Sequence, residues 1–101
     1  MFHVYLIESE SNGKWYIGYT TDLKRRLAEH NRHKNISTAK ESKWKLIYCE
    51  TYLNKMDALG REKFLKSGSG RHFLKKQLMR YLKENSLLRI DESPYYHSAS
   101  S

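Results

Sequence analysis

Two short segments near the start of the chain restrict its fold more than any other feature of the sequence. Residues 2–8 and residues 15–19 each alternate between two sets of side chains, a repeat typical of β-strands, whose successive side chains point to opposite faces of a sheet. Residues 9–14 separate them and contain the pair Asn12-Gly13, which tolerates the positive φ angles of a tight turn. The pattern predicts an antiparallel hairpin.

After the hairpin the pattern becomes helical, then extended, then helical again. Thr21 or Asp22 can cap a helix that runs to about Asn31, because these side chains accept hydrogen bonds from free backbone N–H groups. A third strand is predicted within residues 44–52, where aromatic and aliphatic side chains gather. Asn54 can cap the next helix. Strands and helices in this order predict an α+β domain.

The rest of the chain supports a third helix and two irregular segments. Small residues at 67–70 are expected to interrupt the second helix, and the apolar repeat over residues 73–82 predicts the third. Residues 32–43 are polar and basic without a clear period, which favours a mobile loop. We expect one domain over residues 1–84 and a partly disordered C-terminal extension over residues 85–101.

The charge balance favours a polyanionic partner. Nineteen Lys and Arg against eleven Asp and Glu give a formal net charge of +8. Such a surface attracts nucleic acid through phosphate contacts and counterion release, although charge alone also fits a basic protein that is merely soluble. No helical segment combines a basic face with a wide aromatic face, so membrane binding is not expected.

Cysteine content and hydropathy indicate the cellular compartment in which the protein is expected. Cys49 is the only cysteine of the sequence, so an internal disulfide is excluded and packing alone must hold the fold. The apolar opening segment has neither a basic start nor a cleavage site typical of a signal peptide, and no stretch approaches the roughly 18 apolar residues of a membrane span. These features predict a cytoplasmic protein.

A spaced set of polar residues indicates a function. Arg26 follows Tyr16 by ten residues, and His30 follows Arg26 by four. In full, the set is Val4-Tyr5, Tyr16-Ile17-Gly18, Arg26, His30 and Glu62. In this order it resembles the GIY-YIG nuclease family, over about residues 2–82, and in particular the small stand-alone bacterial members related to the nuclease domain of the excision-repair subunit. The resemblance implies a three-stranded antiparallel sheet flanked by about three helices.

The same resemblance implies an endonuclease that hydrolyses DNA phosphodiesters with a divalent metal ion. It makes Glu62 the ligand of one Mg²⁺ or Mn²⁺ ion and Arg26 the group that stabilises charge on the phosphate. Tyr5 corresponds to the proposed general base, Tyr16 to a tyrosine that orients water or phosphate, and His30 to a residue that relays a proton or orients a tyrosine. A phenol with a pKa near ~10 is a poor base at neutral pH unless a metal ion, Arg or Lys stabilises its phenolate.

Each motif residue also has an ordinary structural interpretation. Without the motif, Glu62 would be read as an exposed helix residue paired with Lys66. Gly18 is expected to let backbone or substrate approach closely, although glycine is also common at strand ends. His3-Val4-Tyr5 replaces the literal Gly-Ile-Tyr, so His3 departs from the family pattern. The late polar residue of the family has no clear match; Gln77 is a candidate only by its distance from Glu62 and is not assigned to catalysis.

Basic side chains outside the motif are expected to position DNA through its backbone rather than to specify its sequence. The candidates for these contacts are Arg25, Lys34, Lys40, Arg71 and Lys75. One cysteine cannot supply a zinc finger, so we expect selection of DNA by structure, for instance branched or damaged DNA, rather than by sequence. Two alternatives remain open, a non-catalytic nucleic-acid-binding module and an adaptor to a partner nuclease. The oligomeric state is not predicted.

Overall fold

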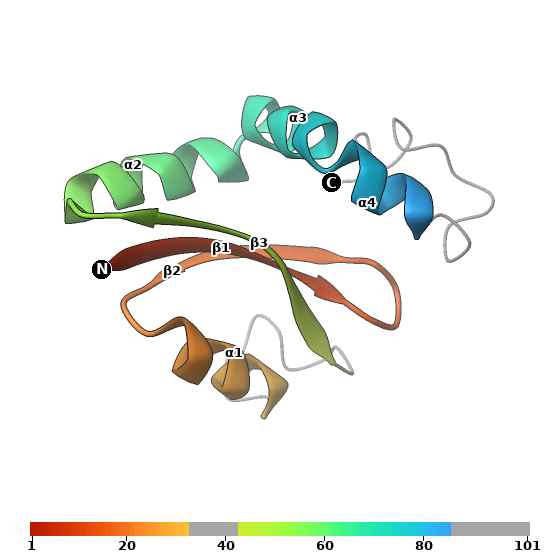
Figure 1. Cartoon of the computed structure of the whole chain (residues 1–101), viewed down its shortest axis with the longest axis horizontal. Helices are drawn as coiled ribbons and strands as arrows, with labels where there is room; N and C mark the ends of the chain where they lie inside the picture. Colours follow the sequence, from red (N-terminus) through yellow and green to blue (C-terminus); the bar gives the residue numbers. More distant parts are fainter. Residues whose placement is uncertain (33–42, 86–101) are drawn as a thin grey trace. The chain divides into compact units, whose positions relative to one another are not determined.

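The computed structural model of this chain describes residues 1–32 and 43–85. Its elements are β1 (Phe2–Ser9), β2 (Trp15–Thr20), α1 (Leu23–Asn31), β3 (Trp44–Tyr52), α2 (Lys55–Lys66), α3 (Gly68–Gln77) and α4 (Met79–Glu84), as labelled in Figure 1. The chain divides into two compact units, residues 1–62 and residues 63–101. Three strands and, in the described residues, four helices confirm the predicted α+β class.

The sheet has β1 at its centre, in the order β2-β1-β3 (Figure 1). β1 pairs antiparallel with both neighbours, so the predicted hairpin and the antiparallel third strand are confirmed. Gly13 in the hairpin turn has a φ of 73°, a left-handed conformation that glycine adopts without a steric penalty. The side chain of Asn12 accepts a hydrogen bond from the Lys14 N–H at 2.9 Å and so stabilises the same turn.

The strand register decides which side chains share a face of the sheet. Tyr5 lies opposite Gly18 of β2 and opposite Cys49 of β3. Because directly paired residues point to the same side, these three positions belong to one face, whereas Val4 and its partner Glu50 belong to the other. Val4 and Tyr5 are both buried, so β1 is covered on both faces.

Helix α1 begins where the sequence predicts a cap, and Asp22 is the residue that provides it. Its carboxylate accepts a hydrogen bond from the Arg25 N–H at 3.0 Å. Its own N–H donates to the hydroxyl of Thr20, the last residue of β2, at 3.0 Å. The start of α1 is therefore held to the end of β2 by local hydrogen bonds.

The apolar side of α1 packs on the Tyr5 face of the sheet. Leu23 and Leu27 contact a buried cluster of Tyr5, Ile7 and Trp44, as expected from the helical repeat. At the end of the helix, the Asn31 side chain donates to the Trp44 carbonyl at 3.1 Å and accepts from the Trp44 N–H at 2.7 Å. These two bonds tie the last turn of α1 to β3.

Helix α2 also begins at its predicted cap. The Asn54 side chain accepts hydrogen bonds from the N–H groups of Met56 at 2.8 Å and Asp57 at 3.2 Å. Ala58 is fully buried, whereas the Met56 side chain is 70% exposed, so the buried side of the helix does not include Met56.

In the second unit, the expected break at residues 67–70 is wrong in its extent. Only Ser67 interrupts the helices, and its hydroxyl caps α3 by accepting a hydrogen bond from the Gly70 N–H at 3.1 Å. A Cβ at Gly70 would lie 1.9 Å from the Phe64 carbonyl oxygen. The glycine is therefore required because of this close approach, and it lies inside a helix rather than in a break.

The third helix expected over residues 73–82 is divided into α3 and α4. Leu78 separates them, with φ of −102° and ψ of 20°, although its N–H still donates to the Leu74 carbonyl at 2.8 Å. Leu74 and Leu82 are buried on either side of this residue. The apolar repeat continues across the division, which is why the sequence pattern did not reveal it.

Two expectations fall mainly outside the described residues. They are the mobile loop over residues 32–43 and the C-terminal extension, so the boundary between residues 84 and 85 stays a prediction. In the part of the chain that is described, no helix is both long enough and apolar enough to cross a bilayer.

Candidate active site

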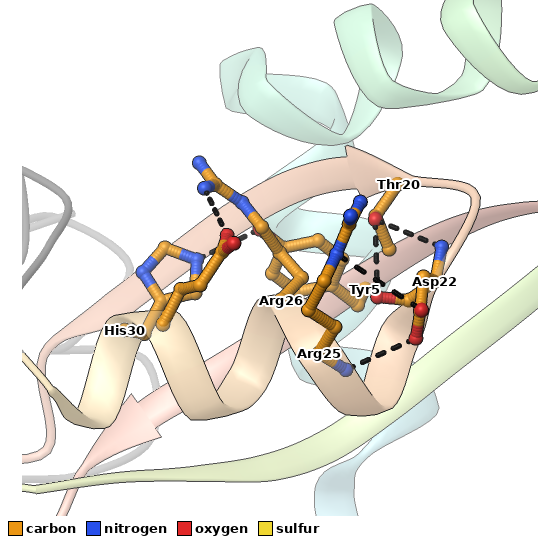
Figure 2. A network of polar contacts seen from close by, with 7 residues as sticks. Tyr5, Thr20, Asp22, Arg25, Arg26 and His30 are labelled. Atoms are coloured by element: carbon orange, nitrogen blue, oxygen red, sulfur yellow. Dashed lines mark hydrogen bonds and ion pairs between the residues drawn. The ribbon is translucent and has the colours of Figure 1, made fainter.

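A buried hydrogen bond joins Tyr5 to His30 on the α1 side of the sheet, where Figure 2 shows the two side chains within a polar network. Tyr5 Oη and His30 Nε2 are 2.8 Å apart, although 25 residues separate them in the sequence. Strand β1 supplies the phenol and the last turn of α1 supplies the imidazole. Because Tyr5 is 2% exposed and His30 is fully buried, water competes little for this hydrogen bond.

Burial sets the protonation states of the pair. It lowers the pKa of His30 from 6.5 to about 4, because an imidazolium would lose its hydration, and the nearby positive charge of Arg26 lowers it further. Burial also raises the pKa of Tyr5 from 10.0 to about 12, against an opposing hydrogen bond from Arg26. At neutral pH the imidazole is therefore neutral and the phenol protonated. In the tautomer that carries its proton on Nδ1, Tyr5 donates and His30 Nε2 accepts.

Tyr16 lies on the same face and completes an aromatic cluster around His30. It pairs with Ile7 across the hairpin, which places it two positions from Gly18 on β2. Its ring centroid is 4.8 Å from that of His30 and 6.4 Å from that of Tyr5. The structure thus brings together both motif tyrosines and the motif histidine.

Gly18 provides the space that the Tyr5 ring occupies. A Cβ at this position would lie 2.3 Å from Tyr5 Oη and 2.5 Å from Tyr5 Cζ, far closer than van der Waals contact. We expected the glycine to admit backbone or substrate. The group that comes close in the structure is the side chain of Tyr5 itself.

Arg26 lies on α1, one turn before His30, and is held by Glu29. Arg26 Nη1 donates to Glu29 Oε1 at 3.0 Å, and each side chain is 31% exposed (Figure 2). Burial alone would lower the pKa of Arg26, but hydrogen bonds with Glu29 and Tyr5 outweigh it and raise the pKa. A permanently charged guanidinium that remains partly exposed is suited to a phosphate oxygen. Arg25, by contrast, is 67% exposed and lies 4.0 Å from the capping Asp22 carboxylate.

Glu62 lies on α2, half-buried, within electrostatic range of the site. Its negative charge is one of the causes that raise the pKa of Tyr5. Within residues 1–32 and 43–85, no group of three or more His, Cys, Asp or Glu side chains gathers as a metal cage. A single carboxylate fits Mg²⁺ or Mn²⁺, because such ions keep several waters and take one or two protein carboxylates together with substrate phosphate.

His3, which departs from the family pattern, is also on the Tyr5 face. It lies opposite Thr20 of β2 and Thr51 of β3. His3 Nδ1 and the Thr51 hydroxyl are 2.9 Å apart, so the side chain takes part in a cross-strand hydrogen bond.

A comparison with known protein families identifies the fold family. The GIY-YIG catalytic domain matches residues 1–77 of the chain. The chain belongs to the GIY-YIG family. The predicted resemblance is thereby confirmed.

Individual GIY-YIG relatives carry the name UPF0213. One from Streptococcus pneumoniae is 42% identical over 65 residues, which cover 63% of this chain and 65% of that protein, slightly less than two thirds of its length. Another from Bacillus licheniformis is 30% identical over 93 residues, which cover 91% of each chain. A solution NMR structure of a UPF0213 protein from Bacillus halodurans is 28% identical, with a TM-score of 0.41, covering 95% of this chain and 92% of that one.

The basic residues expected to contact DNA differ in their surroundings. Lys34 and Lys40 lie outside the described residues. In the second unit of this GIY-YIG chain Arg71 is partly buried, which lowers its pKa. Lys75 is only 7% exposed, and its contact with DNA stays a prediction.

Two carboxylates of the GIY-YIG chain were missed by the sequence interpretation. Glu29 follows Arg26 by three residues, a spacing that brings side chains together on a helix and could have revealed the pair. Glu50 on β3 pairs with Arg61 on α2, with 2.8 Å between Glu50 Oε1 and Arg61 Nε. No local spacing predicts this second pair, since it depends on how α2 packs against the sheet.

Proposed function

We propose that this GIY-YIG protein is a divalent-metal-dependent endonuclease that hydrolyses DNA phosphodiesters. The observation that carries the proposal is the buried 2.8 Å hydrogen bond between the Tyr5 phenol and the neutral imidazole of His30. Hydrolysis needs a group that takes a proton from the attacking water, and the pair offers a phenol oxygen together with a proton acceptor behind it.

In this mechanism the proton moves along the Tyr5 and His30 side chains. The phenol oxygen of Tyr5 takes a proton from the attacking water while its own proton passes to His30 Nε2. The resulting hydroxide attacks phosphorus, and the bond from phosphorus to the leaving sugar oxygen breaks. Transfer through the pair avoids a free phenolate, which would be costly for a group whose pKa is raised to about 12.

Substrate binding makes His30 a better acceptor. The positive charge of Arg26 is the second cause, after burial, that lowers the pKa of His30 to about 4. A DNA phosphate at Arg26 offsets this charge, so the basicity of His30 rises when the scissile phosphate is in place. The partly exposed guanidinium of Arg26 also stabilises the charge that grows on the phosphate.

Glu62 is the carboxylate that would hold Mg²⁺ or Mn²⁺, which when bound supplies positive charge at the phosphate and leaving oxygen. Tyr16, next to the ring of His30, orients water or phosphate. Arg25 is two thirds exposed and contacts a flanking phosphate. Such backbone contacts support selection by DNA structure, with branched or damaged DNA, the material of repair, as the substrate class.

A non-catalytic nucleic-acid-binding module is the second candidate. The Arg26 guanidinium is already paired with Glu29 at 3.0 Å, and a phenol pKa of about 12 does not favour a base. Such a module would bind DNA without any cleavage, and its binding would not depend on Glu62.

A cleavage panel separates the two candidates. Branched, nicked and single-stranded DNA are incubated with wild type, Arg26→Ala and Glu62→Ala in Mg²⁺ and in Mn²⁺. We expect cleavage by wild type and a loss of at least about 100-fold in both variants, the size typical of a lost electrostatic contact in the transition state. Lys24→Ala, which removes an exposed cation of α1 outside the site, should cleave within about twofold of wild type. Salt-sensitive binding with no cleavage above Glu62→Ala on any substrate would favour the binding module.

A further inference from the structure

Glu50 on β3 is the centre of a hydrogen-bond network that reaches α2. Glu50 Oε1 accepts from Arg61 Nε at 2.8 Å and from Tyr52 Oη at 2.7 Å. Glu50 Oε2 accepts from Arg61 Nη2 at 3.0 Å and from Tyr48 Oη at 2.5 Å. Each carboxylate oxygen therefore receives one bond from the guanidinium and one from a tyrosine. We refer to Glu50, Arg61, Tyr48 and Tyr52 as the Glu50 network.

The Glu50 network is partly shielded and its charges are matched. The side chains of Arg61 and Glu50 are 27% and 16% exposed. Burial would raise the pKa of Glu50, but hydrogen bonds from Arg61 and both tyrosines outweigh it and lower the pKa. The carboxylate is thus charged at neutral pH and fully used as an acceptor. A bidentate pair of this kind fixes the distance and the plane of its two partners.

The position of the Glu50 network separates it from the catalytic pair. Glu50 lies opposite Val4, so it occupies the face of the sheet that points away from Tyr5. The ion pairs Arg25–Asp22 and Arg26–Glu29 each join residues that are three positions apart, within α1 and its cap. The Glu50 network instead joins a strand to a helix, over 11 residues of sequence.

Arg61 immediately precedes Glu62, which links the Glu50 network to the site. Successive residues of a helix are about 100° apart around its axis, so fixing the direction of one side chain fixes the direction of the next. For side chains that end about 5–6 Å from the axis, a rotation of about 20° moves the end of the side chain by roughly 2 Å. Metal–ligand distances tolerate only about 0.2 Å.

We propose that the Glu50 network positions Glu62 for metal binding by fixing the rotation of α2 about its own axis. Glu50, Arg61, Tyr48 and Tyr52 are positioning residues in this proposal and touch neither metal nor DNA. The inference rests on the proposed function, because it takes Glu62 as the metal ligand. It adds a reason why the helix that carries Glu62 must be attached to β3 by a planar, bidentate pair.

The test compares Arg61→Lys with wild type by titration with Mn²⁺, using the electron paramagnetic resonance signal of free Mn²⁺ and, separately, the Mn²⁺ dependence of DNA cleavage. Lysine keeps the charge but cannot form the bidentate fork. We expect Mn²⁺ affinity to fall about 10–100-fold, the range for residues that orient a metal ligand. Cleavage at saturating Mn²⁺ should recover most of its rate.

Three further variants distinguish positioning from charge and from general stability. Lys63→Gln removes an exposed positive charge on the other side of Glu62 and should leave Mn²⁺ affinity within about twofold. Tyr48→Phe removes one hydrogen bond to Glu50 but keeps the ring, so it should weaken Mn²⁺ binding less than Arg61→Lys does. If Arg61→Lys does not fold, Tyr48→Phe tests whether the Glu50 network positions Glu62. In a Glu62→Ala background, Arg61→Lys should cause no further loss of Mn²⁺ affinity.

The outcomes that overturn the proposal differ from those that overturn the function. Folded Arg61→Lys, or Tyr48→Phe in its place, with wild-type Mn²⁺ affinity would show that the Glu50 network does not position Glu62. If Arg61→Lys lowers Mn²⁺ affinity equally in the presence and absence of Glu62, the Glu50 network acts on some other group. That result would also overturn the inference. A wild-type protein that neither binds Mn²⁺ nor cleaves DNA would overturn the proposed function and this inference together.

Discussion

Gly18 and Tyr5 are matched residues on neighbouring strands, one without a side chain and one with a large ring. The ring of Tyr5 occupies the space that a side chain at residue 18 would need. A Cβ at this position would lie 2.3 Å from the Tyr5 hydroxyl oxygen. This arrangement explains a motif glycine by the packing of a motif tyrosine, without any need for a special backbone conformation.

Replacing Gly18 by alanine should therefore displace Tyr5 and break its hydrogen bond to His30. We expect Gly18→Ala to lower the free energy of unfolding by about 1–3 kcal/mol, because extra volume in a packed core forces side chains to shift. Cleavage should fall at least about tenfold. Denaturant unfolding and the cleavage assay measure the two effects.

Gly60→Ala is the matched control for this substitution. Gly60 lies inside α2, and no atom outside its own helix backbone lies within 4 Å of the place where a Cβ would stand, so alanine should fit there. We expect this variant to be more stable than wild type by about 0.5–1 kcal/mol, because alanine is the better helix former. Equal effects of the two substitutions would show that Tyr5 does not need the space at Gly18.

His30 should make the stability of the protein depend on pH. Its pKa is about 4 in the folded state and 6.5 as an ordinary histidine, so the unfolded chain binds the extra proton between these values. The contribution of the neutral imidazole is complete above pH 6.5 and is lost as the pH falls toward 4. Such a shift corresponds to about 3 kcal/mol.

Unfolding at pH 7 and pH 4.5, for wild type and His30→Gln, isolates this effect from the titration of carboxylates, which both proteins share. The loss of stability between the two pH values should be larger for wild type by about 2–3 kcal/mol. If both proteins lose the same amount, the pKa of His30 is not lowered by folding.

At the scale of elements, α1 is the part of the chain that assembles the candidate site. It carries Arg26 and His30 on successive turns, and both of its ends are attached to strands. Asp22 holds its start to the end of β2 through Thr20, and Asn31 holds its last turn to Trp44 of β3. The distance between the guanidinium and the imidazole therefore depends on local caps as well as on the core.

The cap of α1 gives a prediction at this scale. Asp22→Ala should lower the free energy of unfolding by about 1 kcal/mol, since the Arg25 N–H loses its acceptor. Thr21→Ala, the neighbouring residue that the sequence also allowed as a cap, should change it by less than about 0.5 kcal/mol. Chemical denaturation of both variants decides which residue caps the helix, and a larger cost for Thr21→Ala would reverse the assignment.

At the scale of the whole molecule, the formal net charge of +8 sets the expected response of DNA binding to salt. The logarithm of the binding constant should fall with the logarithm of salt concentration at a slope steeper than about −3, in buffer with chelator and without divalent metal. Arg25→Ala should reduce the steepness by about one, the value for one lost phosphate contact. Fluorescence anisotropy of labelled DNA measures both slopes, and a flat salt dependence would argue against backbone contacts.

The local chemistry of the sequence predicted most of the fold. The alternating segments and Asn12-Gly13 predicted the hairpin, and the side chains of Asp22 and Asn54 predicted where two helices begin. These features act over a few residues, so they can be read without knowledge of the fold. The break at residues 67–70 was predicted too long and the division at Leu78 was not predicted, because both depend on how the backbone packs nearby.

What the sequence alone determined is the family, the order of the elements and the positions of the motif residues. Only the tertiary structure showed that Tyr5 is hydrogen-bonded to a buried His30, that Lys75 is largely buried, and that Glu50 attaches α2 to β3 beside Glu62. The physical reason is that burial and contacts between distant segments set the protonation state of a side chain and the direction in which it points. Residue spacing describes neighbours along one element, whereas these contacts join side chains that lie 11 to 25 residues apart.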